Sequence, residues 1–167
     1  LIARQAGKFK VRVTVTAGDG FAGLKAVLPP QSRRGLVLID PSYELASDYR
    51  AVVAALRDGL RRFATGTYAV WYPLLQRRES IELPDKLRLA TNVDWLDVTL
   101  QVKAPSPAGL GLHGSGLFIV NPPWKLSARA NTAQFERINV AFSRAQELLV
   151  VVGAKDVFCT YPVDLPF

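Results

Sequence analysis

Residues 35–43 read Gly35-Leu36-Val37-Leu38-Ile39-Asp40-Pro41-Ser42-Tyr43, an uninterrupted apolar run that ends at an acidic residue and a proline. Such a run predicts a strand buried on both faces of a parallel sheet, because a half-exposed strand alternates apolar and polar residues. An amphipathic helix follows at about residues 47–63, with Ser47 as the expected N-cap. A buried strand followed by such a helix indicates an α/β fold.

The alternation of strands and helices continues on both sides of this unit. We expect further helices at about 21–28 and 135–146, and further strands at about 8–17, 67–72, 95–102, 117–120 and 148–152. Residues 76–90 fit a charged helix or loop, interrupted by Pro84. A loop rich in Gly and Pro joins two late strands, which favours an antiparallel addition to a mainly parallel sheet.

The composition is that of an ordinary globular domain. The chain has 167 residues, of which 49% are hydrophobic and 21% charged. No apolar run approaches the roughly 20 residues of a membrane-spanning helix. One Cys and one His exclude a disulfide framework and a Cys/His metal cluster. We therefore expect a cytoplasmic protein with no metal and no membrane partner, and we interpret the start at Leu1, without Met, as internal.

The net charge of +7 is concentrated in the first part of the chain. Residues 1–90 hold 15 Lys and Arg against 8 Asp and Glu, whereas residues 91–167 hold 6 against 6. A basic face favours a polyanionic partner such as nucleic acid, but a solvated surface is equally consistent with these counts. The most conspicuous basic pairs are Arg33-Arg34, Arg61-Arg62 and Arg77-Arg78.

Asp40 directly follows the expected buried strand, and α/β folds bind ligands beyond the carboxyl ends of their strands. The Asp40 carboxylate and the Pro41 carbonyl are two acceptors, which suit the two N–H groups of an amine on a planar base such as adenine. The Tyr43 ring would stack on that base, which must first leave its helix. A plain turn is the simpler interpretation of the same four residues, since Asp and Pro are favoured in turns.

Asp19 offers a second carboxylate. It stands between Gly18 and Gly20, after the strand expected at 8–17. A strand followed by Gly-Asp-Gly can bring a carboxylate and bare backbone up to a cofactor, although a tight turn explains these residues as well. The chain has no Walker A sequence and no G-x-G-x-x-G.

Five blocks in unbroken order resemble one family: residues 18–25, 28–30, 33–41, 62–73 and 114–126. The family is the RlmJ-type 23S ribosomal RNA adenine-N6 methyltransferase, and the resemblance covers about residues 8–126. It implies a class I, S-adenosylmethionine-dependent, Rossmann-like sheet that is N-terminally truncated. It is mainly parallel, with late antiparallel strands.

The resemblance also implies an activity and its residues. The activity is methyl transfer from S-adenosylmethionine to adenine N6 in 23S ribosomal RNA, protein-free or an early precursor, by a monomer. Asp40 matches the catalytic acidic residue of a D-P-P-Y motif, with the Pro41 carbonyl and the Tyr43 ring beside it. Asp19 and Gly20, together with Asp40, match cofactor-contacting positions. Apart from the resemblance, the basic pairs mark Arg33, Arg34, Arg61 and Arg62 as candidates for contacts with RNA phosphates, and solvated faces explain these residues equally well.

The chain departs from the family pattern in three ways. Ser42 stands where the motif has a second Pro, which leaves the aim of the Pro41 carbonyl less fixed and predicts a reduced rate. Asn121-Pro122-Pro123-Trp124 fits the same general pattern, and we interpret it as structural. The family's N-terminal half is absent. We therefore expect the sheet to lack central strands and the strand at 8–17 to lack its neighbour.

The last segment has a different character. Residues 137–145 and 147–153, within about 131–160, resemble motif VI of superfamily 1 helicases, where an Arg at the position of Arg144 reaches the γ-phosphate of ATP. An amphipathic helix that leads into a buried strand explains these residues as well. We expect residues 1–126 to be a partial methyltransferase domain and 127–167 a tail of different origin. Two alternative functions stay open: a non-catalytic basic RNA-binding fragment, or a helicase-derived ATP-site segment.

Overall fold

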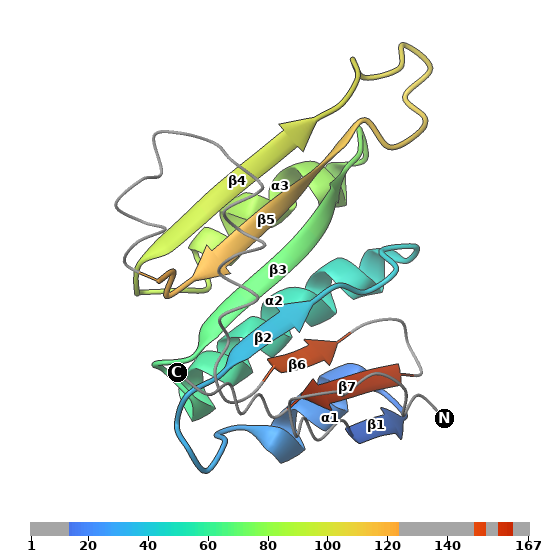
Figure 1. The fold of residues 1–167 in the computed structure, drawn as a ribbon. Coiled ribbons are helices and arrows are strands. Elements are labelled where there is room, and N and C mark those ends of the chain that lie inside the picture. Colours follow the sequence, from blue (N-terminus) through green and yellow to red (C-terminus); the bar gives the residue numbers. More distant parts are fainter. Residues whose placement is uncertain (1–13, 124–148, 153–156, 162–167) are drawn as a thin grey trace, which may run out of the picture.

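The computed structural model describes residues 14–123, 149–152 and 157–161, which form one mixed sheet with helices against it (Figure 1). The helices are α1 (Gly20–Val27), α2 (Ala46–Arg62) and α3 (Arg78–Arg88). The strands are β1 (Thr14–Ala17), β2 (Leu36–Ile39), β3 (Thr67–Leu74), β4 (Trp95–Gln101), β5 (Gly114–Val120), β6 (Leu149–Val152) and β7 (Val157–Tyr161). Their order across the sheet is β1-β7-β6-β2-β3-β5-β4.

The directions of the strands confirm the expected sheet. β2 runs parallel to both β3 and β6, which makes a parallel centre. β5 is antiparallel to β3 and β4, and β7 is antiparallel to β6 and β1. Within the described strands, β1, β6, β2, β3 and β4 therefore run one way and β5 and β7 the other. The fold is α/β, with late antiparallel strands added to a mainly parallel sheet.

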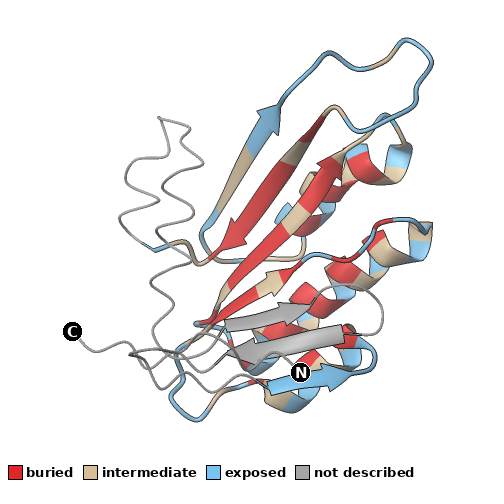
Figure 2. Cartoon of the chain, turned by 45° about the vertical axis from the view of Figure 1, so that its right-hand side comes forward, coloured by how far each residue is buried: buried red, intermediate tan, exposed pale blue. Residues whose placement is uncertain are grey.

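The core lies between the sheet and the three described helices, which cover the same face of it (Figures 1 and 2). Buried side chains of β2, β3 and β5 alternate toward this face, because successive side chains of a strand point to opposite sides. The helices meet them with apolar residues at helical spacing. The fully buried members of this layer include Val37, Ile39, Val52, Leu56, Tyr68, Val70, Leu83, Leu87, Phe118 and Val120.

Gly116 of β5 allows close packing of a tyrosine across the sheet. The Tyr72 hydroxyl of β3 donates a hydrogen bond of 2.8 Å to the Asp97 carboxylate of β4, across the intervening strand β5. The Tyr72 ring passes over Gly116, where an added Cβ would lie 2.1 Å from the ring. Gly116 therefore leaves the space that lets a buried tyrosine reach its partner.

One local expectation needs correction. The N-cap of α2 is Leu45 and not Ser47, since the helix begins at Ala46 and the Leu45 N–H donates to the Asp48 carboxylate. Ser47 lies within the first turn. The charged segment after β3, expected to be a helix or a loop, is the helix α3, which has Pro84 in its interior.

The C-terminal segment contributes two strands to the sheet. β6 confirms the strand expected at 148–152, whereas β7 was not predicted. Both lie between β2 and β1, so the expectation that β1 lacks a neighbour is wrong: β1 pairs with β7. The helix expected at 135–146 and Arg144 lie outside the described residues. Within the described ranges, no helix has the length and apolar character of a membrane span.

Candidate active site

Asp40 lies at the carboxyl end of β2, at the edge of the sheet where parallel strands end. The residue is exposed, and no residue of the described ranges donates a hydrogen bond to its carboxylate. Neighbouring atoms still remove part of the water around it, and this desolvation raises the pKa of Asp40 above its usual value. An acceptor without a protein partner is available to a ligand.

The backbone beside Asp40 offers a second acceptor. Pro41 is buried and Ser42 is exposed, and both lie beyond the end of β2 at Ile39. In the described part of the chain nothing donates to the Pro41 carbonyl. The structure thus leaves the two expected acceptors, the carboxylate and the carbonyl, adjacent in sequence and without partners. We call residues 40–45 the Asp40 loop.

Tyr43 is held inside the protein. Its side chain is 3% exposed and its hydroxyl donates a hydrogen bond of 2.6 Å to the Trp71 carbonyl. Its ring lies 4.9 Å from the Tyr49 ring and 6.3 Å from the Trp71 ring, between centroids. Burial, and next the Asp40 carboxylate, raise the pKa of Tyr43 well above its usual value, which keeps the hydroxyl protonated as a donor. In this conformation the ring has no open face for a base.

The backbone of Tyr43 is strained. Its φ is 55°, in the left-handed region that residues other than Gly, Asn and Asp seldom adopt. Such a conformation persists only where the surroundings hold it. Here the Arg77 Nη1 atom, at the start of α3, donates to the Tyr43 carbonyl at 3.4 Å and to the Glu44 carbonyl at 3.3 Å. The Arg77 guanidinium also lies 5.1 Å from the centre of the Tyr49 ring.

Asp19 lies at the same edge of the sheet as Asp40. β1 and β2 run in the same direction, so the residues that follow them reach one edge. Three strand spacings separate them, which is about 14 Å. One Asp19 oxygen accepts hydrogen bonds from the Phe21 and Ala22 N–H groups, at 2.9 and 3.4 Å, and so caps α1. Gly20 is buried as the first residue of that helix.

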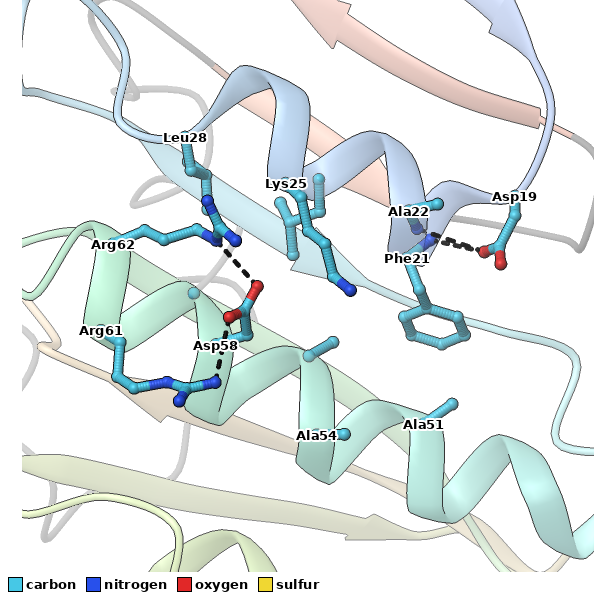
Figure 3. Close-up of a pocket in the computed structure, with 13 residues that line it drawn as sticks. Asp19, Phe21, Ala22, Lys25, Leu28, Ala51, Ala54, Asp58, Arg61 and Arg62 are labelled. Carbon is cyan, nitrogen blue, oxygen red and sulfur yellow. Dashed lines mark hydrogen bonds and ion pairs between the residues drawn. The ribbon is translucent and has the colours of Figure 1, made fainter.

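A cavity of about 340 Å³ opens between α1 and α2 (Figure 3). Asp19 lies at one end of it and Asp58, with Arg61 and Arg62, at the other. The Asp58 carboxylate accepts from the Arg61 guanidinium at 3.1 Å and from the Arg62 guanidinium at 2.8 Å. These arginines, Arg62 first, lower the pKa of Asp58. Most of the residues that line the cavity are apolar, its Asp58 carboxylate is paired with Arg61 and Arg62, and Asp40 is not part of its wall.

The arginines expected to contact RNA do not gather around Asp40. Arg33 and Arg34 precede β2, and Arg61 and Arg62 end α2, so all four lie toward the amino ends of β2 and β3. The length of β2, about 13 Å, separates that edge from Asp40. The structure therefore places these basic residues at one edge of the sheet and the two acidic residues at the other.

The residues at the carboxyl edge fit S-adenosylmethionine in their chemistry. The cofactor carries a sulfonium and an ammonium, and exposed carboxylates without an Arg or Lys partner attract such cations. Asp40 has no cationic partner among the described residues, and only one Asp19 oxygen serves the cap of α1. No cluster of three or more His, Cys, Asp or Glu side chains suited to a metal occurs in the described ranges.

The turn at Asn121 uses its polar side chain differently. The Asn121 Nδ2 atom donates to the Ala64 carbonyl and to the Gly66 carbonyl, each at 2.8 Å. Its own carbonyl accepts from the Thr67 hydroxyl at 3.0 Å. These contacts give Asn121 the structural role that was expected, whereas Trp124 of the same pattern lies outside the described residues. The contacts join the end of β5 to the start of β3, at the edge opposite Asp40.

Arg77 was missed as a site residue. In the sequence it is one of several basic pairs, with nothing to distinguish it from Arg78. Its contacts connect residues more than 30 positions apart, and no local pattern encodes them. The only local signal is its place just before the first residue of α3.

Comparisons with known proteins all identify the same family. A family model described as "Ribosomal RNA large subunit methyltransferase D, RlmJ" matches residues 2–145. The chain is 45% identical to "Ribosomal RNA large subunit methyltransferase J" of Escherichia coli (strain K12) over 120 residues, which are 72% of this chain and 42% of that protein. The protein of the same name from Haemophilus influenzae is 45% identical over 117 residues, 70% of this chain and 41% of its own length.

A solved structure agrees with the fold. It is that of a Legionella pneumophila protein assigned to the family DUF519, with a TM-score of 0.61 and 30% identity. The superposition covers 73% of this chain and 44% of that one. The chain thus spans less than half the length of the relatives it matches.

Proposed function

The chain belongs to the family of ribosomal RNA large subunit methyltransferases described as methyltransferase D, RlmJ, and we propose that it methylates adenine N6 in 23S ribosomal RNA. The observation that carries the proposal is Asp40. Its carboxylate follows a buried strand, is exposed, and has no partner in the described part of the chain. We further propose that the protein acts as a cytoplasmic monomer on protein-free or early precursor RNA.

Asp40 and Pro41 would hold the reacting amine. The adenine N6 nitrogen is a poor nucleophile because its lone pair is delocalised into the ring. If the Asp40 carboxylate and the Pro41 carbonyl each accept one N–H bond, the lone pair is drawn out of conjugation and toward the methyl donor. The donor, S-adenosylmethionine, supplies a methyl group on a cationic sulfur. A nearby carboxylate such as Asp40 also favours the binding of that cation.

Tyr43 would stack on the target base, and this role needs a movement. Its ring is buried against Tyr49 and Trp71, so one face must be uncovered before a base can lie on it. A movement of the side chains that cover the ring would supply that face, with the backbone of the Asp40 loop kept in place. The flipped base would then replace the apolar contact that the ring loses. We propose Asp19 and Gly20 as the cofactor-binding residues at the same edge, about 14 Å across the sheet.

The test is methyl transfer by the 167-residue chain. The substrate is protein-free large-subunit ribosomal RNA with labelled S-adenosylmethionine, and the digested product is scored for N6-methyladenosine by mass spectrometry. The wild-type chain is expected to produce the modified nucleoside and Asp40→Ala none. Asp85→Asn is a matched control, because Asp85 is an exposed acid of α3 whose partner is Arg88. Equal turnover by wild type and Asp40→Ala contradicts the proposed role.

A second candidate is RNA binding without catalysis. The basic residues Arg33, Arg34, Arg61 and Arg62 lie at the edge away from Asp40, which favours a phosphate-binding role that is independent of the carboxylate. This candidate predicts salt-dependent RNA binding and no saturable binding of S-adenosylmethionine. Replacing Arg33 and Arg61 with Gln should then weaken RNA binding and reduce its salt dependence. No described contact favours the third alternative, an ATP site that uses Arg144.

A further inference from the structure

The geometry points to Arg77 as the positioning residue that fixes the Asp40 loop, and this inference rests on the proposed function of Asp40 and Tyr43. Arg77 lies 37 positions along the chain from Asp40. It is the residue before α3, and its side chain reaches back across the end of β3 to the loop. It contacts the backbone of the loop directly, and it also contacts the Tyr49 ring, against which the Tyr43 ring packs.

The first contact is with the loop carbonyls. One nitrogen of the Arg77 guanidinium is shared by the Tyr43 and Glu44 carbonyls, at 3.4 and 3.3 Å. A charged donor makes stronger hydrogen bonds than a neutral one. These two carbonyls belong to the turn in which Tyr43 takes its left-handed conformation. Arg77 therefore stabilises the backbone geometry that is otherwise unfavourable at residue 43.

The second contact is with an aromatic ring. The Arg77 guanidinium lies over the Tyr49 ring at 5.1 Å, and that ring packs against Tyr43 at 4.9 Å. The Tyr43 hydroxyl completes the arrangement through its hydrogen bond to the Trp71 carbonyl. One cation thus supports Tyr43 from its own carbonyl and from the ring beneath it.

The guanidinium is itself held in place. Its Nε atom donates to the Glu79 carboxylate at 3.3 Å, an ion pair within the first turn of α3. That pairing leaves Nη1 directed at the loop. A planar guanidinium can serve a carboxylate, two carbonyls and a ring face at once, which an ammonium cannot. Arg77 and not Lys is therefore the residue that suits this position.

Arg78 provides the matched comparison. It is the next residue, carries the same charge, and pairs with Glu82 on the outer side of α3. Its side chain is 85% exposed and makes no described contact with the Asp40 loop. Replacing Arg77 or Arg78 with Gln removes the same charge from the same turn of the same helix. Only the first replacement removes the support of the loop.

The experiment measures amide hydrogen exchange in the full 167-residue chain, which does not depend on activity. Arg77→Gln is expected to speed exchange of the Leu45 N–H, which donates to the Asp48 carboxylate, by about tenfold or more, with α3 and β2 protected as in the wild type. Arg77→Lys should restore part of this protection, and Arg78→Gln should match the wild type. Equal exchange in Arg77→Gln and Arg78→Gln overturns the inference. Loss of protection throughout α3 also overturns it, because Arg77 would then be only a helix-end residue.

Methyl transfer separates the inference from the proposed function. If the wild-type chain transfers methyl groups, Arg77→Gln should lower kcat by about 10- to 100-fold, because a displacement of about 1 Å at reacting groups costs that much. The KM for S-adenosylmethionine should stay within about twofold of the wild-type value. Faster exchange with unchanged kcat overturns the positioning role. A wild-type chain without transfer refutes the proposed function, while the exchange result still decides whether Arg77 fixes the loop.

Discussion

The Asp40 loop and the turn at Asn121 share a pattern, an Asp or Asn followed by proline at the end of a buried strand, but their polar side chains have different partners. The Asn121 amide donates to two backbone carbonyls at 2.8 Å. The Asp40 carboxylate accepts from no residue in the described ranges, and desolvation raises its pKa. The two turns also lie at opposite edges of the sheet, since β2 and β5 run in opposite directions.

This difference separates a structural turn from a candidate site. Buried or half-buried polar groups are normally satisfied inside the protein, and Asn121 follows that rule. A carboxylate that loses water without gaining a donor makes the folded state less stable. Such an arrangement is expected where a ligand supplies the missing donor. The four-residue pattern alone does not distinguish the two turns, whereas their hydrogen bonds do.

The largest expected effect comes from changing the charge at each turn. Asp40→Asn keeps the shape of the side chain but replaces an acceptor oxygen with a donor, and it should lower methyl transfer by about a hundredfold or more. Asn121→Asp should leave the transfer rate of the folded fraction within about twofold of the wild type. The measurement is the initial rate of N6-methyladenosine formation, normalised to folded protein. A comparable loss of rate in both variants would contradict the assignment of Asp40 to the site and of Asn121 to a structural turn.

The second prediction concerns stability at Asn121. Asn121→Ala removes two hydrogen bonds and places alanine at a φ of 50°, which together should cost about 2 kcal/mol. For a chain of this size the melting temperature should fall by about 4–8 °C. Asn121→Gly separates the two causes, since glycine tolerates this φ and loses only the hydrogen bonds. A fall in the alanine variant no larger than in the glycine variant would show that the backbone conformation contributes nothing.

The sequence was sufficient for what depends on local pattern. The apolar run 36–39 predicts a buried strand, and its end places Asp40 at the carboxyl edge of the parallel strands. The burial of Tyr43 was not predictable, because it depends on Tyr49 of α2 and Trp71 of β3. The role of Arg77 depends on contacts across the fold as well. The pairing of β1 with β7 joins residues 140 to 146 positions apart, which no local signal encodes.

The third prediction tests the rigidity of the Asp40 loop. Ser42→Pro restores the motif proline, and no described residue accepts a hydrogen bond from the Ser42 N–H. A proline in a compatible conformation stabilises a folded protein by about 0.4–1 kcal/mol, because it reduces the conformational entropy of the unfolded chain. If the backbone freedom of residues 41 and 42 limits the aim of the Pro41 carbonyl, kcat should rise by about two- to fivefold. Steady-state kinetics of the two proteins measures this, and a lower kcat in the proline variant would mean that Ser42 is the better residue in this loop.

The smallest effect is on the pH dependence of stability, and it has a definite sign. Desolvation raises the pKa of Asp40 in the folded state, so the folded protein holds its proton to higher pH than the unfolded chain does. The charged carboxylate therefore lowers stability above the folded-state pKa, and this cost disappears below the unfolded value of 3.8. Asp40→Asn, which is never charged, should melt slightly higher than the wild type at neutral pH.

The difference between Asp40→Asn and the wild type should shrink as the pH falls through the folded-state pKa of Asp40. Asn121→Asp should behave in the opposite way. Its new carboxylate would face the Ala64 and Gly66 carbonyls, so that variant should melt below the wild type at neutral pH and recover part of the loss in acid. Melting curves of the three proteins between pH 4 and pH 8 measure both differences. An Asp40→Asn protein less stable than the wild type at neutral pH would mean that the carboxylate has a stabilising partner, and the contrast between the two turns would fail.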